Sequence, residues 1–354
     1  MGLSISPPTP FATSRQTGPV RKWRMSANPL LIVRRLVVRY PQPRLLPWRK
    51  PHWRNAVDGL DFNLHAGETL GIVGESGCGK SSLAKALLGL QPIAAGAALF
   101  NGTDLARLDK KGWKPLRREI QMVFQDPLAS LDPRMKVGRI IEQPLIALRP
   151  DIGKAERPQR VAAMLERVGL SAADMHRKAH EFSGGQCQRI ALARALVVEP
   201  KLLICDEPVS ALDVSIQAEV VNLLAELQRD LGLAMLFIAH DLAIVRQMAQ
   251  RVLVMYAGTV MEQAPREPLF SQPLHPYTRS LLAAVPGNQA PGAISSVLTA
   301  ERPSSTAGDS VTVGCRYRDR CEIADDFCGR DVPPLRRMAP EHFAACHFIA
   351  ATSS

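Results

Sequence analysis

The chain has 354 residues, 46% of them hydrophobic, which predicts a globular protein with one large domain and an appendage. It contains no window of eighteen or more uncharged apolar residues, and the start MGLSISPPTPFATSRQTG lacks the apolar run of a secretion signal, so we expect a cytosolic chain that does not span a membrane by itself. The net charge of +11 lies at one end, because residues 1–56 hold eleven Lys or Arg and no Asp or Glu; such an end is either a solvated tail or a surface for phosphates or anionic membranes.

The first structural signals along the chain are β-strands. Residues 1–28 are rich in Pro, Ser, Thr and Arg without apolar periodicity, so we expect this basic N-terminal tail to be disordered. Strands are predicted over 30–40 (LLIVRRLVVRY) and within 56–74, with a turn at HAGE, and the Pro- and Arg-rich segment 41–54 separates them. The chain therefore begins with a β-rich unit.

From Lys80 onward, predicted helices and buried strands alternate. The helical patterns cover 81–90, 155–170, 186–200 and 215–232, and the buried strands cover 120–124, 201–205 and 234–240. This alternation implies a parallel sheet covered by helices. After residue 264 the chain becomes Pro-rich and weakly patterned.

The stretch GESGCGKS, residues 74–81, follows the apolar strand TLGIV and precedes a predicted helix. Glycines at these positions let backbone N–H groups point at phosphate oxygens, and the helix start adds its positive dipole end. Lys80 would reach the β- and γ-phosphates, Ser81 would give its hydroxyl to Mg²⁺, and Ser82 would hold a further phosphate oxygen. The sequence therefore predicts a nucleoside triphosphate site made of Gly74, Glu75, Ser76, Gly77, Cys78, Gly79, Lys80, Ser81 and Ser82.

Two later strands end in residues that suit hydrolysis. KLLICDEP places Asp206 and Glu207 at the carboxyl end of a buried strand, where open parallel sheets bind their ligands. Asp206 can orient Mg²⁺ through its water shell, and Glu207 can polarise the water that attacks the γ-phosphate. The strand AMLFIAH brings His240 to the same edge, where it can steady that water.

The stretch EFSGGQ, at 181–186, offers a second phosphate-binding surface at the start of a predicted helix. One triphosphate does not obviously fill both surfaces within one compact domain. We therefore expect Ser183, Gly184, Gly185 and Gln186 to close over the nucleotide of a partner chain.

Four of the seven cysteines crowd the last forty residues: Cys315, Cys321, Cys328 and Cys346. They could bind zinc or an iron–sulfur cluster, or stay as free thiols, and their spacing is diagnostic of none of these. His342 and His347 are alternative ligands, although surface or packing roles explain them as well. Seven thiols in a cytosolic chain argue against a disulfide frame.

Together and in this order, GESGCGKS, VFQDP, FSGGQ, ICDEP, SALD and IAH resemble the ATP-binding subunits of ABC transporters over residues 30–280. The resemblance implies an α/β fold, a P-loop NTPase of the ABC type, with a RecA-like parallel sheet core, an antiparallel β subdomain and a helical subdomain. It also implies a head-to-tail dimer that holds each ATP between one chain's phosphate loop and the other chain's SGGQ. In such a dimer, Tyr40 would stack on adenine, Gln125 would contact Mg²⁺ and begin the loop that faces the membrane partner, and Asp213 would join the two halves.

Within this family the chain is similar to the dipeptide, oligopeptide and nickel importer branch, through VFQDPLASLDPRMKVG, CDEPVSALDVSIQAEVVNLL and HPYTRSLL, and to its second ATPase subunit. The branch implies a heterodimer with another ATPase subunit, with a homodimer as the other option, on the cytoplasmic face of the inner membrane. The further partners are two transmembrane permease subunits and an extracytoplasmic solute-binding protein; the solute is undetermined. The tail resembles that branch's terminal extension, with which a [4Fe-4S] cluster has been associated. Two residues depart from the pattern, Cys187 after SGGQ and Cys205 before Asp206.

The resulting domain hypothesis has three parts: a disordered tail at 1–28, an ABC ATPase domain at 29–265 with its helical subdomain at about 126–190, and a C-terminal oligopeptide-transporter-type extension at 266–354 that carries the four cysteines. An ABC-type ATPase acting on nucleic acid or ribosomes is the alternative, because the N-terminal end is basic. It fits less well, because the chain has a single ATPase unit and no heptad run, and no nucleic acid partner is expected. A metal-binding regulatory module would need a broken catalytic set, whereas Glu207 and His240 are both present.

Overall fold

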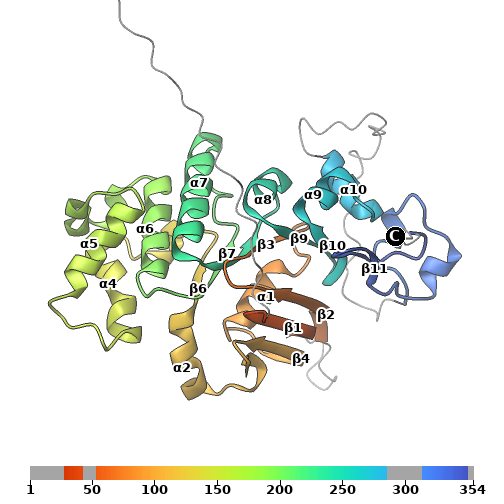
Figure 1. Cartoon of the computed structure of the whole chain (residues 1–354), viewed down its shortest axis with the longest axis horizontal. Helices are drawn as coiled ribbons and strands as arrows, with labels where there is room; N and C mark the ends of the chain where they lie inside the picture. Colours follow the sequence, from red (N-terminus) through yellow and green to blue (C-terminus); the bar gives the residue numbers. More distant parts are fainter. Residues whose placement is uncertain (1–27, 43–52, 285–312, 350–354) are drawn as a thin grey trace, which may run out of the picture.

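The structure, a computed structural model, describes residues 28–42, 53–284 and 313–349 (Figure 1). The N-terminal tail predicted to be disordered covers residues 1–28, of which 1–27 lie outside the described residues, as does most of the Pro- and Arg-rich segment 41–54. The described residues form two sheets and the helices around them.

The smaller sheet is antiparallel and has the strand order β2-β1-β4-β5. Side chains along a strand point alternately to the two faces of the sheet. Those of the first strand that point inward are apolar and buried, as in Leu31, Val33, Leu36 and Val38. The strands are β1 (Leu31–Pro41), β2 (Trp53–Leu64), β4 (Ile93–Phe100) and β5 (Thr103–Asp104). This sheet is the β-rich unit that the sequence predicts.

The larger sheet has the order β11-β12-β10-β9-β3-β8-β7-β6. Five neighbouring strands, β9, β3, β8, β7 and β6, run parallel, and the remaining three continue the sheet antiparallel. Their bounds are β3 (Thr69–Val73), β6 (Ile120–Val123), β7 (Leu202–Asp206), β8 (Ala234–Ile238), β9 (Arg251–Tyr256), β10 (Thr259–Pro265), β11 (Arg336–Ala339) and β12 (His342–Ala344). The sheet is therefore mixed, whereas the alternating pattern predicts only its parallel part.

Both faces of the parallel strands are buried, because alternate residues enter two different cores. In β7, Leu203 and Cys205 join the core under α7 and α8, and Leu202 and Ile204 join the core shared with α1 and the smaller sheet. Figure 1 shows α7 and α8 on one side of the large sheet, and α1 with β1, β2 and β4 on the other. Burial on both faces explains why these strands are continuously apolar.

The helical patterns predicted at 81–90, 155–170, 186–200 and 215–232 form helices with adjusted ends, and the described residues contain further helices that were not predicted. The helices nearest the sheet are α1 (Lys80–Leu87), α2 (Lys110–Glu119), α7 (Val214–Leu231), α8 (Leu242–Met248), α9 (Arg266–Ser271) and α10 (Pro276–Ala283). A separate group contains α3 (Pro127–Ser130), α4 (Val137–Leu148), α5 (Arg157–Arg167) and α6 (Gly184–Leu196). Short 3₁₀ turns lie at Leu105–Arg107, Ala172–His176, Ala179–Glu181, Arg318–Arg320 and Asp326–Gly329.

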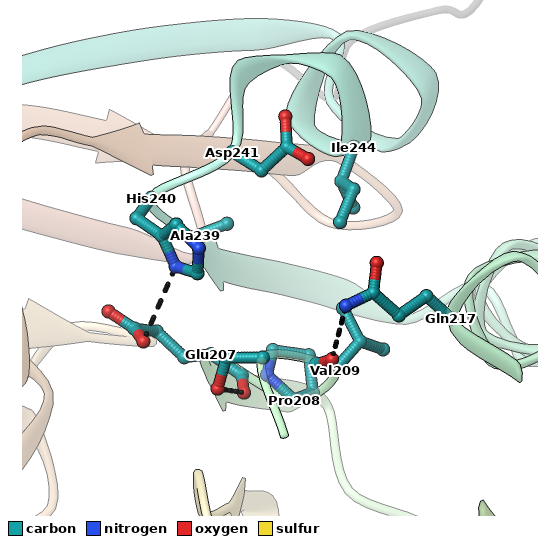
Figure 2. Close-up of a pocket in the computed structure, with 9 residues that line it drawn as sticks. Glu207, Pro208, Val209, Gln217, Ala239, His240, Asp241 and Ile244 are labelled. Carbon is teal, nitrogen blue, oxygen red and sulfur yellow. Dashed lines mark hydrogen bonds and ion pairs between the residues drawn. The ribbon is translucent and has the colours of Figure 1, made fainter. Parts of the chain in front are cut away.

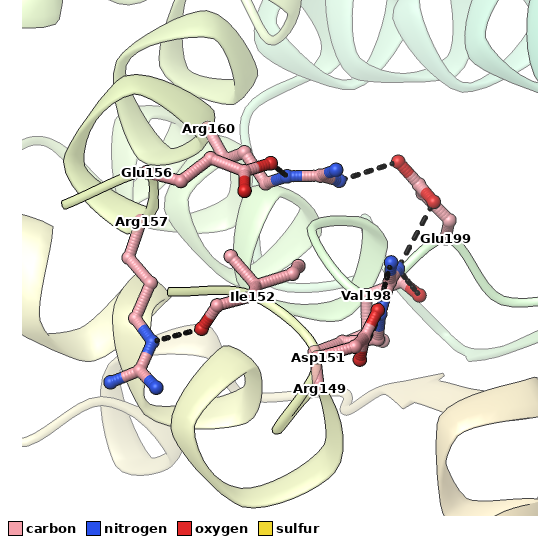
Figure 3. A network of polar contacts seen from close by, with 8 residues as sticks. All are labelled: Arg149, Asp151, Ile152, Glu156, Arg157, Arg160, Val198 and Glu199. Carbon is pink, nitrogen blue, oxygen red and sulfur yellow. Dashed lines mark hydrogen bonds and ion pairs between the residues drawn. The ribbon is translucent and has the colours of Figure 1, made fainter. Parts of the chain in front are cut away.

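A polar network ties the helical group together around the buried guanidinium of Arg149 (Figure 3). Arg149 Nη2 lies 2.9 Å from Asp151 Oδ2, and its Nη1 lies 3.1 Å from Glu199 Oε2. Arg160 Nη1 reaches the other oxygen of Glu199 at 3.0 Å. The segments that follow α4 and α6 are thereby joined to the first turn of α5.

The last described part of the chain packs on the large sheet. Strand β12 pairs with β10 through Glu262 with Ala344 and Gln263 with Phe343, and β11 pairs with β12. The predicted separate cysteine-containing extension is therefore not supported in that form, because these residues complete the edge of the ATPase sheet.

Candidate nucleotide-binding site

The loop between β3 and α1 has a backbone that only glycine accepts at two points. Gly74 has φ 152° and Gly79 has φ 109°. A Cβ on Gly74 would lie 2.1 Å from the carbonyl oxygen of Met255, and a Cβ on Gly79 would lie 2.1 Å from that of Ala56. The loop is thus pressed against β9 and the end of the smaller sheet, and its turn presents backbone N–H groups at the start of α1.

Lys80 is buried, and its ammonium lies within this loop. Nζ donates to the carbonyl oxygens of Gly74 at 2.7 Å and Glu75 at 3.0 Å. A positive charge is therefore fixed beside the exposed N–H groups of the turn. This is the arrangement that phosphate binding needs, and the sequence predicts it.

Ser81 and Asp206 meet at the start of α1 and the end of β7. Ser81 Oγ donates to Asp206 Oδ1 at 3.1 Å. Burial raises the pKa of Asp206, while the hydrogen bond from Ser81 opposes the rise. A cation held beside these two oxygens would compensate the cost of burying the carboxylate, so the pair suits Mg²⁺.

Glu207 follows at the same edge and gathers two further predicted residues. Its Oε2 accepts from Gln125 Nε2 at 3.2 Å and lies 3.5 Å from His240 Nδ1 (Figure 2). The backbone of Glu207 has φ 48°, a strained value for a non-glycine residue, and its N–H donates to Ile238 O at 2.9 Å. The strain and the β8 contact fix the carboxylate between the ends of β7 and β8.

A small cavity of about 30 Å³ lies beside Glu207 and His240, and it has room for a water molecule. Its walls come from the segment after β7 and the segment after β8, and Figure 2 shows both carrying their side chains toward it. Gln217 Nε2 donates to Val209 O and to Leu212 O, each at 2.9 Å, and so shapes the segment between β7 and α7. No motif in the sequence indicated this role of Gln217.

The SGGQ stretch forms the capped start of α6. Ser183 N–H donates to Gln186 Oε1 at 3.0 Å, and Gln186 N–H donates to Ser183 Oγ at 3.4 Å, which is a reciprocal capping box. Gly185 lies against α7, where a Cβ would be 2.5 Å from Ile216 Cγ2. Figure 1 shows α6 among α4 and α5, to one side of α1, so this helix start belongs to a different part of the chain from the phosphate loop.

The remaining predicted residues lie at accessible positions. Asp213 is exposed just before α7, next to Val214, which is 82% exposed. Tyr40 lies near the end of β1, half-buried against the core that also contains Cys78. Cys187 points away from the surface, with its thiol near Ala179 O, so it does not alter the exposed face of SGGQ.

The structure does not support the metal site predicted at the four tail cysteines. In the described part of the chain, no group of three or more His, Cys, Asp or Glu side chains is arranged to hold a metal ion, and all four thiols are free. Burial is the main cause that raises the pKa of Cys315 and Cys321, and neighbouring tail cysteines raise it further. The prediction of iron–sulfur or zinc through Cys315, Cys321, Cys328 and Cys346 is therefore not supported, and His342 instead contacts the buried Glu262.

Two residues that sequence reasoning missed touch the phosphate loop. The Glu75 backbone N–H donates to Tyr277 Oη at 2.9 Å, and Arg320 Nη1 lies 2.8 Å from Glu75 Oε2. Tyr277 stands in the stretch HPYTRSLL, which carries only a family resemblance in the sequence, and Arg320 lies 245 positions from Glu75. No local pattern could have joined them to the loop.

Two known protein families match successive parts of the chain. A family described as "ABC transporter" matches residues 57–210, and one described as "Oligopeptide/dipeptide transporter, C-terminal region" matches residues 261–328. The chain is 49% identical over 300 residues to the oligopeptide transport ATP-binding protein OppF of Haemophilus influenzae, covering 84% of this chain and 90% of that protein. It is 47% identical over 299 residues to the oligopeptide transport ATP-binding protein AppF of Bacillus subtilis, covering 83% and 90%.

Solved structures show the same fold. A dimeric ATP-binding cassette in a post-hydrolysis state, bound to ADP and Pi, matches with a TM-score of 0.59 at 26% identity, over 67% of this chain and 98% of that one. The protein cbiO1 from Clostridium perfringens, part of the ABC transporter complex cbiONQ, matches with a TM-score of 0.59 at 31% identity, over 69% and 91%.

Proposed function

The chain belongs to the ABC transporter family of ATP-binding proteins, and from that premise we propose that it binds and hydrolyses ATP to energise the import of peptides or related small solutes. The names of its relatives support the solute class, since both are oligopeptide transport proteins. The match of residues 261–328 to the C-terminal region of oligopeptide and dipeptide transporters supports it independently of the ATPase fold.

One observation carries the ATPase part of the proposal. Four polar side chains from separate segments, Ser81, Gln125, Asp206 and His240, converge with Glu207 at the carboxyl edge of the parallel strands through contacts of 3.1 to 3.5 Å. This is the edge at which open parallel sheets bind ligands.

At this edge the phosphate loop would bind the triphosphate. The N–H groups from Gly77 to Ser82 and the ammonium of Lys80 would hold the β- and γ-phosphates, with Glu75 and Ser76 shaping the turn. Mg²⁺, when bound, would neutralise the charge that develops on the phosphates. Ser81, Gln125 and Asp206 would hold it, and Tyr40 would stack on the adenine.

Glu207 would act as the general base. A water beside its carboxylate would attack the γ-phosphorus, its proton would pass to Glu207, and the bond to the β-phosphate oxygen would break to give ADP and phosphate. His240, 3.5 Å from Glu207 Oε2, would orient the water and contact the γ-phosphate. The cavity beside Glu207 and His240 supports this placement of the water.

The capped start of α6 would complete the site of a partner chain. The first N–H groups of a helix have no partner within it, and Ser183 leaves the donors of Gly184 and Gly185 for a ligand. We place Ser183, Gly184, Gly185 and Gln186 on the γ-phosphate side of the partner's ATP, with Asp213 at the contact between the two chains. The dimeric form of a solved relative supports this assembly.

The partners follow from the same proposal. They are a second ATPase subunit, in a heterodimer rather than a homodimer, two permease subunits, and a solute-binding protein that acts through the permeases. No helix in the described ranges is long and apolar enough to cross a membrane, so we place the chain peripherally on the cytoplasmic face of the inner membrane. ATP would close the dimer and hydrolysis would reopen it, which moves the permeases between their two orientations.

The domain limits remain part of the proposal: an ATPase domain at 29–265, with its helical subdomain at about 126–190, and a C-terminal part at 266–354. The nucleic acid alternative gains no support, because the relatives in the comparison are transport proteins. Of the basic residues 1–56 on which it depends, 1–27 and 43–52 lie outside the described residues.

Substitution of the base tests the proposal. We expect Glu207→Gln to bind MgATP normally, to lower phosphate release in the assembled transporter at least a hundredfold, and to accumulate the closed dimer. Glu226→Gln, an exposed glutamate on α7, is the control and should keep full turnover. Rapid hydrolysis by Glu207→Gln, or failure of the unaltered chain to bind MgATP, would refute the proposal.

A further inference from the structure

Glu75 of the phosphate loop is held from outside the loop by two side chains of the C-terminal part. Tyr277 accepts from its backbone N–H at 2.9 Å, and Arg320 pairs with its carboxylate at 2.8 Å. We call Tyr277 and Arg320 the C-terminal brace. The same residue faces into the loop, because its carbonyl oxygen accepts from Lys80 Nζ at 3.0 Å and from the Cys78 N–H at 3.3 Å.

The tyrosine of the brace has little freedom to move. Its side chain is 1% exposed, packs edge-on against Tyr256 at 4.8 Å between ring centroids, and lies tilted against Tyr317 at 5.2 Å. Rotation of a ring in such a cluster would require its neighbours to move. The hydroxyl therefore stands at a fixed place beside Glu75.

The arginine of the brace is fixed by the same rings. The guanidinium carbon of Arg320 lies 5.8 Å from the ring centroids of both Tyr256 and Tyr317. Arg320 lies in the short turn Arg318–Arg320, which follows Tyr317 directly. An arginine held on two aromatic faces keeps its direction toward a carboxylate better than a free surface arginine does.

The segment that carries Tyr277 is anchored to the large sheet through a buried carboxylate. Glu262 of β10, 0% exposed, accepts from the backbone N–H groups of Leu274 at 2.9 Å and His275 at 2.8 Å. Its Oε1 also lies 2.7 Å from His342 Nε2 of β12. The start of α10, strand β10 and the last strand pair thus form one connected support behind the brace.

These contacts give the loop a second set of restraints beside its own turn. Without Tyr277, the Gly74–Glu75 peptide could rotate, because its N–H would lose its partner, and the Gly74 carbonyl that accepts from Lys80 at 2.7 Å would rotate with it. The loop binds phosphates through backbone N–H groups, which must point at the phosphate oxygens. If the loop has to become ordered before it binds, its affinity for nucleotide is lower.

We propose that Tyr277 and Arg320 are positioning residues for the phosphate loop, so that the C-terminal part of the chain sets the affinity of the site for nucleotide. This inference rests on the nucleotide site of the proposed function and assigns to the C-terminal part a role in that site. Neither residue touches the phosphates; both act through Glu75.

Paired tyrosine substitutions test the first contact. Tyr277→Phe keeps the ring and removes the hydroxyl that accepts from Glu75. Tyr317→Phe removes a buried hydroxyl from the same cluster, whose partner is Ser280 Oγ at 3.2 Å, away from the loop. We expect Tyr277→Phe to raise the Kd of the full chain for MgADP about fivefold, the effect of one net hydrogen bond, and Tyr317→Phe to leave it unchanged. Calorimetric titration measures both.

A charge cycle tests the second contact. We expect Arg320→Gln and Glu75→Gln each to raise the Kd for MgADP about threefold, the double variant to be no weaker than either, and Arg320→Lys to restore most of the affinity. In the assembled transporter, KM for ATP should rise in Tyr277→Phe and Arg320→Gln while kcat stays within twofold. A higher KM with an unchanged kcat indicates that positioning of the loop is impaired. A general loss of structure would instead lower the amount of active protein and hence the apparent kcat.

The outcomes distinguish this inference from the proposed function. Tight MgADP binding by the unaltered chain, with the same Kd in Tyr277→Phe and Arg320→Gln, would overturn the inference and leave the ATPase proposal standing. Equal weakening by Tyr277→Phe and Tyr317→Phe would also overturn it, since the effect would then belong to the aromatic cluster. Failure of the unaltered chain to bind MgADP would instead refute the proposed function.

Discussion

Substitution of Gly74 by alanine tests whether the phosphate loop depends on its close approach to β9. A Cβ at this position would lie 2.1 Å from Met255 O and 2.8 Å from Cys78 Sγ, and φ is 152°. Separations under 3.0 Å are essentially never seen, so the loop must retreat from Met255 by at least about 0.9 Å. A positive φ costs alanine roughly 1–2 kcal/mol, and forced repacking against a backbone carbonyl adds about 1–3 kcal/mol.

We therefore expect Gly74→Ala to lower the free energy of unfolding by about 2–5 kcal/mol. A displacement near 1 Å costs roughly a hundredfold where geometry decides function, so the Kd for MgADP should rise at least tenfold. Urea unfolding of the full chain and calorimetric titration with MgADP measure the two effects. The loop can shift while both sheets stay folded, so the titration with MgADP is carried out on the folded fraction of the variant.

Gly102→Ala is the matched control, because Gly102 has φ 82°, no atom within 4 Å of a new Cβ, and a place in the turn between β4 and β5. It should lose about 1–2 kcal/mol of stability from its positive φ alone and should bind MgADP as the unaltered chain does. If Gly74→Ala and Gly102→Ala lost the same stability and neither changed the affinity, the close approach to Met255 would have no energetic weight.

Two further predictions concern the helix cap and a buried histidine. Ser183→Ala removes the acceptor for the Gln186 N–H, which should cost about 1 kcal/mol of stability and slow phosphate release by the assembled transporter, while MgADP binding by the isolated chain stays unchanged; a loss of that binding would contradict action in trans. Burial lowers the pKa of His275 to about 4; the charge of Arg279 lowers it as well, and the charge of Glu262 raises it. Between pH 6.5 and 4, His275 is therefore protonated in the unfolded chain but not in the folded chain. Stability should be complete above pH 6.5 and fall by at most about 3 kcal/mol as the pH drops toward 4, and His275→Gln should flatten this dependence in urea unfolding; an unchanged slope would contradict it.

The part of the site that the sequence predicted is the part that is local in the chain. A strand, a glycine turn and a helix start are adjacent in residues 69–87, so the position of Lys80 and Ser81 follows from backbone geometry alone. Asp206 and Glu207 were predicted by a second local rule, since they end a buried parallel strand. His240 comes just after another such strand and meets Glu207 because β7 and β8 are neighbours.

Contacts that depend on long-range pairing were not predictable. The sequence does not show that β12 pairs with β10, that Glu262 is buried among backbone donors, or that Tyr277 reaches the loop. The metal prediction gains no support from the described residues, because cysteine spacing counts possible ligands but does not say how the chain arranges them. The pKa of Cys315 is raised by burial and then by the neighbouring thiols of Cys328, Cys321 and Cys346, and neither cause can be read from cysteine spacing.

The start of α6 and the start of α7 form one surface, and this argues for the partner chain. Gly185 lies so close to Ile216 that the two helices must meet at their first turns, which places SGGQ beside Val214. Val214 is 82% exposed although it is apolar, and Asp213 next to it is exposed as well. Exposure of the apolar Val214 side chain to water is unfavourable, and a second chain with an apolar surface would bury it. The N–H donors at the start of α6 have no partner within the helix, and a phosphate on that second chain would supply one. In the proposed dimer, the partner's phosphate loop would bring such a phosphate to these residues, and closure of the dimer would then depend on nucleotide.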